Sequence, residues 1–132
     1  MRKVRKLIIF ILCMLITAVI VLRIAGFKSY SIETESMVPT LAVDDMVYIY
    51  PVSFESLNKG DVITYVIDDK GTTITHRIIS IDEDNKTVQT QGDNNEYPDI
   101  EPVGEENIIG KMVFKIPLLG KLEFLNNLKG DD

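Results

Sequence analysis

One serine and the sole histidine are the side chains best suited to chemistry in this chain. Ser36 lies in a short segment that contains proline, and His76 lies in a stretch rich in Thr and Ile. A serine hydroxyl needs a nearby base to act as a nucleophile, and imidazole, with an ordinary pKa of about 6.5, can accept that proton. Taken alone, however, a strand histidine and a serine beside a proline are more often structural.

Four short segments support a functional role for Ser36 and His76. Residues 35–41 (ESMVPTL) resemble the nucleophile box of type I signal peptidases, and residues 59–63 (KGDVI) resemble a strand start of the same family. Residues 75–78 (THRI) match the box in which histidine replaces the bacterial lysine, and residues 91–95 (QGDNN) match the Gly-Asp-Asn-Asn box of that branch. The branch holds enzymes of the endoplasmic reticulum, of archaea and of some spore-forming Gram-positive bacteria. The four boxes follow the family order.

The resemblance implies a serine endopeptidase that removes signal peptides as exported proteins leave the translocation channel. Ser36 would be the nucleophile and His76 the general base. The Ser36 backbone N–H and the Thr34 hydroxyl would form the oxyanion hole. The substrates would carry small residues at the first and third positions before the cut, and shallow apolar pockets near Met37 would bind them.

A histidine base usually needs a carboxylate on its second ring nitrogen. We expect Asp93 to fill this role, because it occupies the Gly-Asp-Asn-Asn box, and Asp99 is the alternative, because the family carries another acid just after that box. The chain also has Asp44-Asp45 where relatives usually have Gly-Asp, a change that affects a turn.

The sequence offers two other functions. A lysine-base peptidase would need a lysine where His76 stands, and Lys70 lies six residues away in an expected turn. A non-catalytic relative, tethered to the membrane as an assembly factor for surface fibres or pili, would not need to keep Ser36, His76 and Asp93. No Cys/His cluster or Gly-rich loop is present, so we expect neither a metal nor a cofactor.

The N-terminal segment reads as a membrane anchor. A basic start, residues 1–6, precedes an apolar run of about 20 residues that would span roughly 30 Å as a helix. The basic flank favours an N-terminus in the cytoplasm. We therefore expect residues 7–27 to form the transmembrane helix and residues 28–132 to form an extracytoplasmic domain. In a eukaryote this membrane would be the endoplasmic reticulum. A cleaved secretory signal is the competing interpretation.

The chain after the anchor is acidic. All 20 acidic residues and nine basic residues follow Phe27, which leaves this part with a net charge of −11 and makes nucleic acid an unsuitable partner. The chain from Phe27 to Ser36 spans at most about 30 Å when extended, so Ser36 would work beside the lipid.

The same part of the chain is expected to be mainly β, a small sheet or barrel of the signal-peptidase type. Segments rich in Val, Ile, Thr and Tyr predict strands at residues 30–34, 46–50, 62–67, 72–81, 87–91 and 108–116. Residues 93–107 read as a long loop. Leu118, Leu122, Leu125 and Lys129 recur at helical spacing and predict a short C-terminal amphipathic helix.

Overall fold

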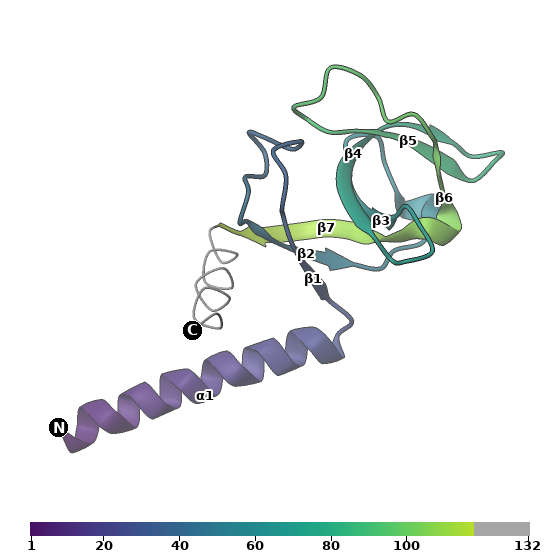
Figure 1. Cartoon of the computed structure of the whole chain (residues 1–132). Helices are drawn as coiled ribbons and strands as arrows, with labels where there is room; N and C mark the ends of the chain where they lie inside the picture. Colours follow the sequence, from purple (N-terminus) through teal and green to yellow (C-terminus); the bar gives the residue numbers. More distant parts are fainter. Residues whose placement is uncertain (118–132) are drawn as a thin grey trace.

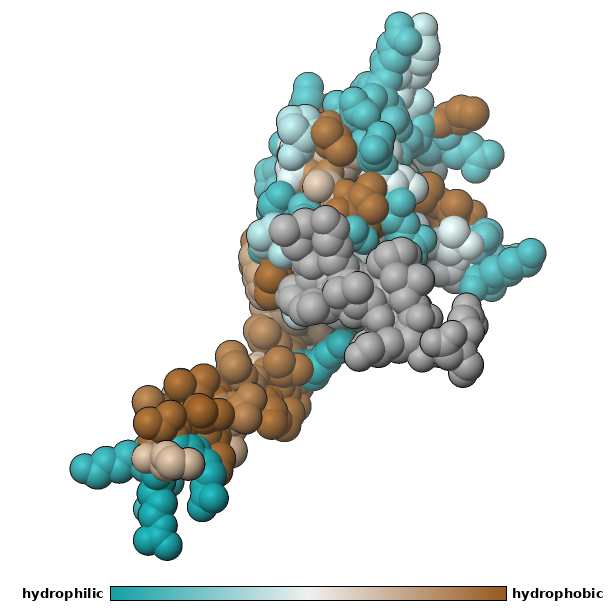
Figure 2. Space-filling model, turned by 60° about the vertical axis from the view of Figure 1, so that its left-hand side comes forward, coloured by the Kyte–Doolittle hydropathy of each residue, from teal (hydrophilic) through white to brown (hydrophobic). Residues whose placement is uncertain are grey.

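A long apolar helix leads into a curled β-sheet in the computed structural model, which describes residues 1–117 (Figure 1). Helix α1 runs from Arg2 to Ile24, and none of its side chains is buried. It is long and apolar enough to cross a membrane, and Figure 2 shows its apolar surface with a hydrophilic patch at the N-terminal end. The predicted C-terminal helix lies outside the described residues.

Seven strands form the sheet in the order β1-β2-β7-β3-β4-β5-β6, and all neighbouring strands are antiparallel. The strands are β1 (Lys28–Ser31), β2 (Met46–Tyr50), β3 (Val62–Val66), β4 (Thr73–Asp82), β5 (Thr87–Gln91), β6 (Val103–Gly104) and β7 (Ile108–Ile116). Register shifts within the β2–β7, β3–β7 and β4–β5 pairs mark bulges, which bend a sheet and help it curl. The expected fold class, a mainly β domain preceded by one helix, is confirmed.

The predicted strands agree with the observed ones except at the ends and in one place. Strands β2, β5 and β7 have the predicted bounds, whereas β1 lies earlier than residues 30–34. The predicted loop at 93–107 contains the two-residue strand β6 and a 3-10 turn, Glu105–Asn107. A two-residue strand has no periodicity, so the pattern could not reveal it.

Two turns behave as their residues require. Gly71, in the hairpin between β3 and β4, has a φ of 83°, as expected for the glycine of such a loop. Asp44, which stands where relatives usually have glycine, has a φ of 72°. Asp is one of the few non-glycine residues found in this left-handed region, so the turn forms with an aspartate in that conformation.

Two apolar clusters position the elements that carry the candidate site. One contains Tyr65 of β3 and Ile78 of β4, packed with Phe54, Leu57, Ile63, Val88 and Val103. The other contains Met37 and Leu41, which are both fully buried and pack with Ile32, Val47 and Val62. Ser36 therefore lies directly before a residue that anchors its loop to the core.

Candidate active site

Ser36, His76 and Asp99 lie in a hydrogen-bonded row. The distance from Ser36 Oγ to His76 Nε2 is 3.1 Å, and His76 Nδ1 lies 2.7 Å from Asp99 Oδ2. Ser36 comes from the loop after β1, His76 from strand β4 and Asp99 from the loop after β5. Because Nδ1–H donates to the carboxylate, Nε2 carries the lone pair and can accept the serine proton. In this arrangement the imidazole can activate the serine hydroxyl as a nucleophile.

The Asp99 carboxylate is held by three donors on one oxygen. Besides His76, the hydroxyls of Thr90 and Tyr65 donate to Oδ2 at 2.6 and 2.9 Å. Burial alone would raise the pKa of Asp99, but the hydrogen bonds from these three side chains and the charge of His76 hold it below its ordinary value. Asp99 therefore stays ionised and can stabilise an imidazolium.

Tyr65 is itself held in its neutral form. Burial raises the pKa of its hydroxyl well above the ordinary value, and the neighbouring Asp99 charge raises it further. Tyr65 remains a proton donor to Asp99 at any physiological pH. Neither Tyr65 nor Thr90 was predicted from the sequence, because both lie in ordinary-looking strands, and only the pairing of β3, β4 and β5 brings their hydroxyls to Asp99.

The structure does not place Asp93 on the histidine, contrary to our first expectation. The Asp93 carboxylate instead accepts hydrogen bonds from Arg77 Nε and Nη2 at 2.8 and 2.6 Å and from the Thr40 hydroxyl at 2.6 Å. The hydrogen bond from Arg77 lowers the pKa of Asp93. The side chains of neighbouring strand residues point to opposite faces, so Arg77 and its partner lie on the face away from His76.

The Gly-Asp-Asn-Asn box holds the nucleophile loop. Asn94 N–H donates to the Ser36 carbonyl at 2.8 Å, and Asn94 Nδ2 donates to the Glu35 carbonyl at 3.2 Å. A Cβ added at Gly92 would lie 2.6 Å from the Ser36 carbonyl oxygen, which is too close for any side chain. The box thus packs against the backbone of Ser36, whereas its aspartate makes no hydrogen bond to the histidine within residues 1–117.

The Thr34 hydroxyl lies 3.0 Å from Ser36 Oγ. Within residues 1–117 the Ser36 backbone N–H has no hydrogen-bond acceptor. Both expected oxyanion donors therefore lie beside the nucleophile, and one of them is unoccupied.

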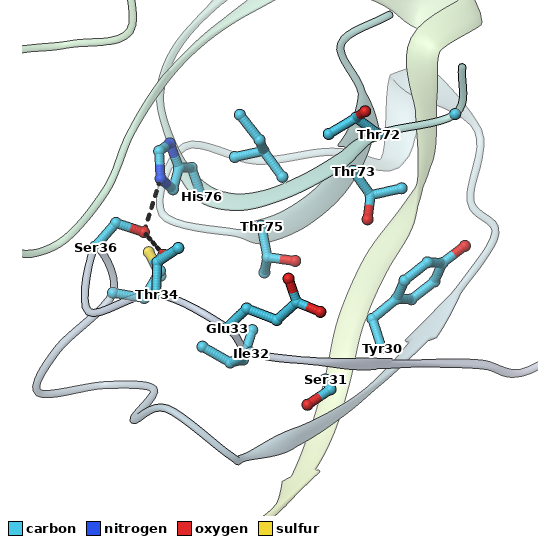
Figure 3. A pocket seen from close by; sticks show the side chains of 13 residues that line it. Tyr30, Ser31, Ile32, Glu33, Thr34, Ser36, Thr72, Thr73, Thr75 and His76 are labelled. Carbon is cyan, nitrogen blue, oxygen red and sulfur yellow. Dashed lines mark hydrogen bonds between the residues drawn. The ribbon is translucent and has the colours of Figure 1, made fainter. Parts of the chain in front are cut away.

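A groove of about 650 Å³ leads away from Ser36 and His76 (Figure 3). One wall is the segment from Tyr30 to Thr34, and the other is the segment from Gly71 to Thr75 at the start of β4. Met37, the expected substrate contact, lines the groove although its side chain is only 1% exposed, so it belongs to the floor.

Both walls of this groove present unpaired strand edges. Ile32 exchanges backbone hydrogen bonds with Asp44 and Asp45 on the side of β2. The N–H and C=O of the next residue, Glu33, therefore face away from β2, and within the described residues they make no backbone hydrogen bond. Strand β4 pairs with β5 only from Arg77 onward, so its first half has a free edge in the described part of the chain. An extended peptide can pair with both edges.

Comparisons with known proteins place this chain in a family. The family described as signal peptidase, peptidase S26, matches residues 4–94. Signal peptidase I W of Bacillus subtilis is 33% identical over 96 residues, which cover 70% of this chain and 50% of that protein. The signal peptidase complex catalytic subunit SEC11 of Eremothecium gossypii is 32% identical over 102 residues, covering 68% of this chain and 60% of that protein.

The chain thus spans about half to three fifths of the length of the curated relatives it matches. The match includes Ser36 and His76 but ends before Asp99, whose place beside the histidine is a finding of geometry. A family match over more than half of the chain, together with a serine and a histidine in contact, identifies the chain as a member of the signal peptidase family, peptidase S26.

Proposed function

We propose that this chain is a membrane-bound serine endopeptidase that removes signal peptides from exported proteins. The observation that carries the proposal is the 3.1 Å contact between Ser36 Oγ and His76 Nε2. Hydrogen-bond reach between a hydroxyl and an unprotonated imidazole nitrogen is the requirement for an activated serine. The family match and the names of the relatives supply the substrate class.

The reaction follows from the three side chains. Ser36 Oγ attacks the scissile carbonyl carbon while its proton passes to His76 Nε2. The imidazolium then gives this proton to the leaving amine as the peptide bond breaks, which leaves an ester on Ser36. Water, deprotonated by the same imidazole, hydrolyses the ester and frees the serine. Asp99 keeps the ring oriented and stabilises its positive charge throughout.

Negative charge develops on the carbonyl oxygen in each half of the reaction. We expect the Ser36 N–H, which has no acceptor within residues 1–117, and the Thr34 hydroxyl, 3.0 Å from Ser36 Oγ, to donate to it. Thr34 must rotate its O–H from Ser36 Oγ toward the oxyanion, which a hydroxyl rotor does freely. The Ser36 N–H needs no such rotation, and a donor that is fixed before the reaction lowers the barrier because it needs no reorganisation.

The groove supports a substrate in the extended form. A peptide between the two free edges would place alternate side chains toward the floor formed by Ile32 and Met37, both of which are buried. This closed floor leaves little depth for a side chain. Small residues at the first and third positions before the cut suit such a floor.

Helix α1 supports a site at the membrane surface. Strand β1 begins at Lys28, just beyond the helix end at Ile24, and leads through Tyr30 into the groove. We propose that α1 is an uncleaved anchor with its basic start in the cytoplasm and residues 28–132 on the other side. A signal peptide that leaves the translocation channel would then reach the groove directly from the lipid.

Purified full-length protein in detergent, incubated with a preprotein, tests this function. We expect one new N-terminus in the product, read by mass spectrometry, and no cleavage by the Ser36→Ala variant. A Ser36→Ala variant that still cleaves would refute the serine mechanism. Binding of the preprotein without cleavage by the unaltered chain would favour the non-catalytic assembly factor instead.

A further inference from the structure

The substrate groove carries one acidic side chain, Glu33. Apart from the His76 imidazole and the Tyr30 phenol, it is the sole ionisable side chain among the described residues that line the groove. Figure 3 shows its carboxylate in the space between the strand that carries Tyr30 and the β4 segment that carries Thr75. The side chain is exposed, and within residues 1–117 no lysine or arginine pairs with it. A carboxylate is therefore free to meet whatever enters the groove.

The strand geometry determines which substrate side chains it meets. The Ile32 side chain faces the buried floor of the groove. The side chain of Glu33, the next residue on the same extended segment, therefore points away from the floor. A substrate strand paired with Glu33 has its own side chains alternating in the same way. The first and third residues before the cut face the floor, so the second and fourth face Glu33.

We propose that Glu33 selects substrates with a lysine or arginine at the second or fourth position before the cut. This inference rests on the proposed function and names a charge preference within it. Side chains directly opposite on paired strands lie about 5 Å apart at Cβ, within reach of an ion pair. Glu33 lies only three residues before Ser36, so the chain between the two spans at most about 10 Å.

The surroundings favour such a preference. The threonines and serine on the groove walls are neutral, and the domain after the anchor has nine basic against 20 acidic residues, so its long-range field attracts a cationic peptide. An acidic substrate side chain at the same place would meet both Glu33 and this field. An exposed ion pair changes affinity by about twofold to fivefold, and salt weakens it.

The experiment compares preproteins that differ in one residue, with lysine, alanine or glutamate at the second or fourth position before the cut. At low salt we expect kcat/KM to fall from lysine to alanine to glutamate at one or both positions, by about twofold to fivefold per step. The Glu33→Gln variant should lose this order, and Glu33→Lys should reverse it. Raising the salt concentration should flatten the order in the unaltered chain.

Glu83→Gln is the matched control, because it removes the same charge from the exposed β4–β5 turn, outside the groove. This control should keep the order of the unaltered chain. Two results would overturn the inference and leave the proposed function intact. One is that Glu33→Gln keeps the order of kcat/KM for lysine, alanine and glutamate substrates, and the other is that the unaltered chain cleaves these substrates equally well. Failure of the unaltered chain to cleave even the alanine substrate would overturn both.

Discussion

A single oxygen, Asp99 Oδ2, accepts hydrogen bonds from His76, Thr90 and Tyr65. Charge-assisted bonds of this kind hold a carboxylate in one place and keep it ionised. The orientation of His76 thus depends on a carboxylate that is itself oriented by two hydroxyls. At the scale of single residues, the account predicts distinct results for Asp99, for Asp93 and for the hydroxyls.

The two candidate aspartates should differ in what they affect. Asp99→Asn removes the acceptor that selects the Nδ1–H tautomer, so we expect kcat to fall by about a thousandfold or more. Asp93→Asn weakens the contact with Arg77, so we expect mainly a lower melting temperature. Thermal unfolding monitored by circular dichroism measures it. A larger loss of kcat in Asp93→Asn than in Asp99→Asn would contradict the assignment.

Tyr65→Phe tests the support of Asp99. Without this donor the pKa of Asp99 rises and its position loosens, so kcat should fall by about threefold to tenfold while KM is unchanged. The acid limb of the kcat profile should move to higher pH. Tyr48→Phe is the control. The Tyr48 ring stacks on that of Phe114 with 4.6 Å between the ring centroids, and within residues 1–117 no hydrogen bond joins Tyr48 to Ser36, His76 or Asp99. Identical pH profiles for Tyr65→Phe and the unaltered chain would exclude the role.

The sequence could nominate Ser36 and His76 because short boxes surround each of them. It ranked Asp93 above Asp99 wrongly, because both lie in the same loop and only the folded path of that loop decides which one reaches the ring. Tyr65 and Thr90 carried no local pattern at all. Their hydroxyls meet Asp99 through strand pairing, which depends on residues far apart in the chain.

At the scale of elements, the site depends on how closely loops and strands approach. The box at residues 91–95 lies against the nucleophile loop, with Gly92 as the point of closest approach. Gly92→Ala would push the Ser36 backbone away, and we expect kcat to fall by about tenfold or more because small misplacements are costly. The measurement is the steady-state cleavage rate.

Gly104→Ala is the control for this prediction. The three atoms nearest to its added Cβ all belong to the Glu106 side chain, which can rotate aside. We expect this variant to keep its cleavage rate. Equal rates for Gly92→Ala and the unaltered chain would show that the loop is not held at this point.

The ion pair between strand β4 and the box predicts a pH-dependent stability. Arg77 lowers the pKa of Asp93, so the folded state gains stability above the ordinary aspartate pKa and loses it as the pH falls through the lowered value. At pH 7 the free energy of unfolding of the unaltered chain should be roughly 1–2 kcal/mol higher than that of Asp93→Asn. This difference should shrink below about pH 4, as Asp93 becomes protonated. Denaturant unfolding at several pH values measures this. A constant difference would contradict it.

The strands themselves were largely predictable, because their alternation and β-branched content are local properties. Strand β6 was not predictable, since two residues carry no pattern. The curl of the sheet was not predictable either, since the bulges are irregularities in the pairing of strands that lie far apart in the sequence. The free edge of β4 also escaped prediction. It follows from the point at which β5 begins to pair, which is a matter of register.

At the scale of the whole molecule, α1 and the sheet have separate tasks. The helix exposes its apolar side chains all round, whereas the sheet carries the site (Figures 1 and 2). A membrane supplies the apolar surroundings that such a helix needs. The account therefore predicts that the two ends of α1 lie on opposite sides of a membrane.

Single cysteines test this topology in a Cys13→Ala background. With a reagent that cannot cross membranes, Asp84→Cys in the β4–β5 turn should be labelled in intact cells. Lys3→Cys at the start of α1 should be labelled only after the membrane is opened. Labelling of position 3 alone in intact cells would reverse the orientation.

The central claim is that His76 is the base that deprotonates Ser36. The most direct measurement is kcat/KM for preprotein cleavage by two full-length variants, His76→Ala and Lys70→Ala. Lys70 lies in the exposed β3–β4 hairpin and does not line the groove. We predict that His76→Ala abolishes cleavage, by about a thousandfold or more, and that Lys70→Ala leaves it nearly unchanged. The opposite outcome, an active His76→Ala and an inactive Lys70→Ala, would contradict the account.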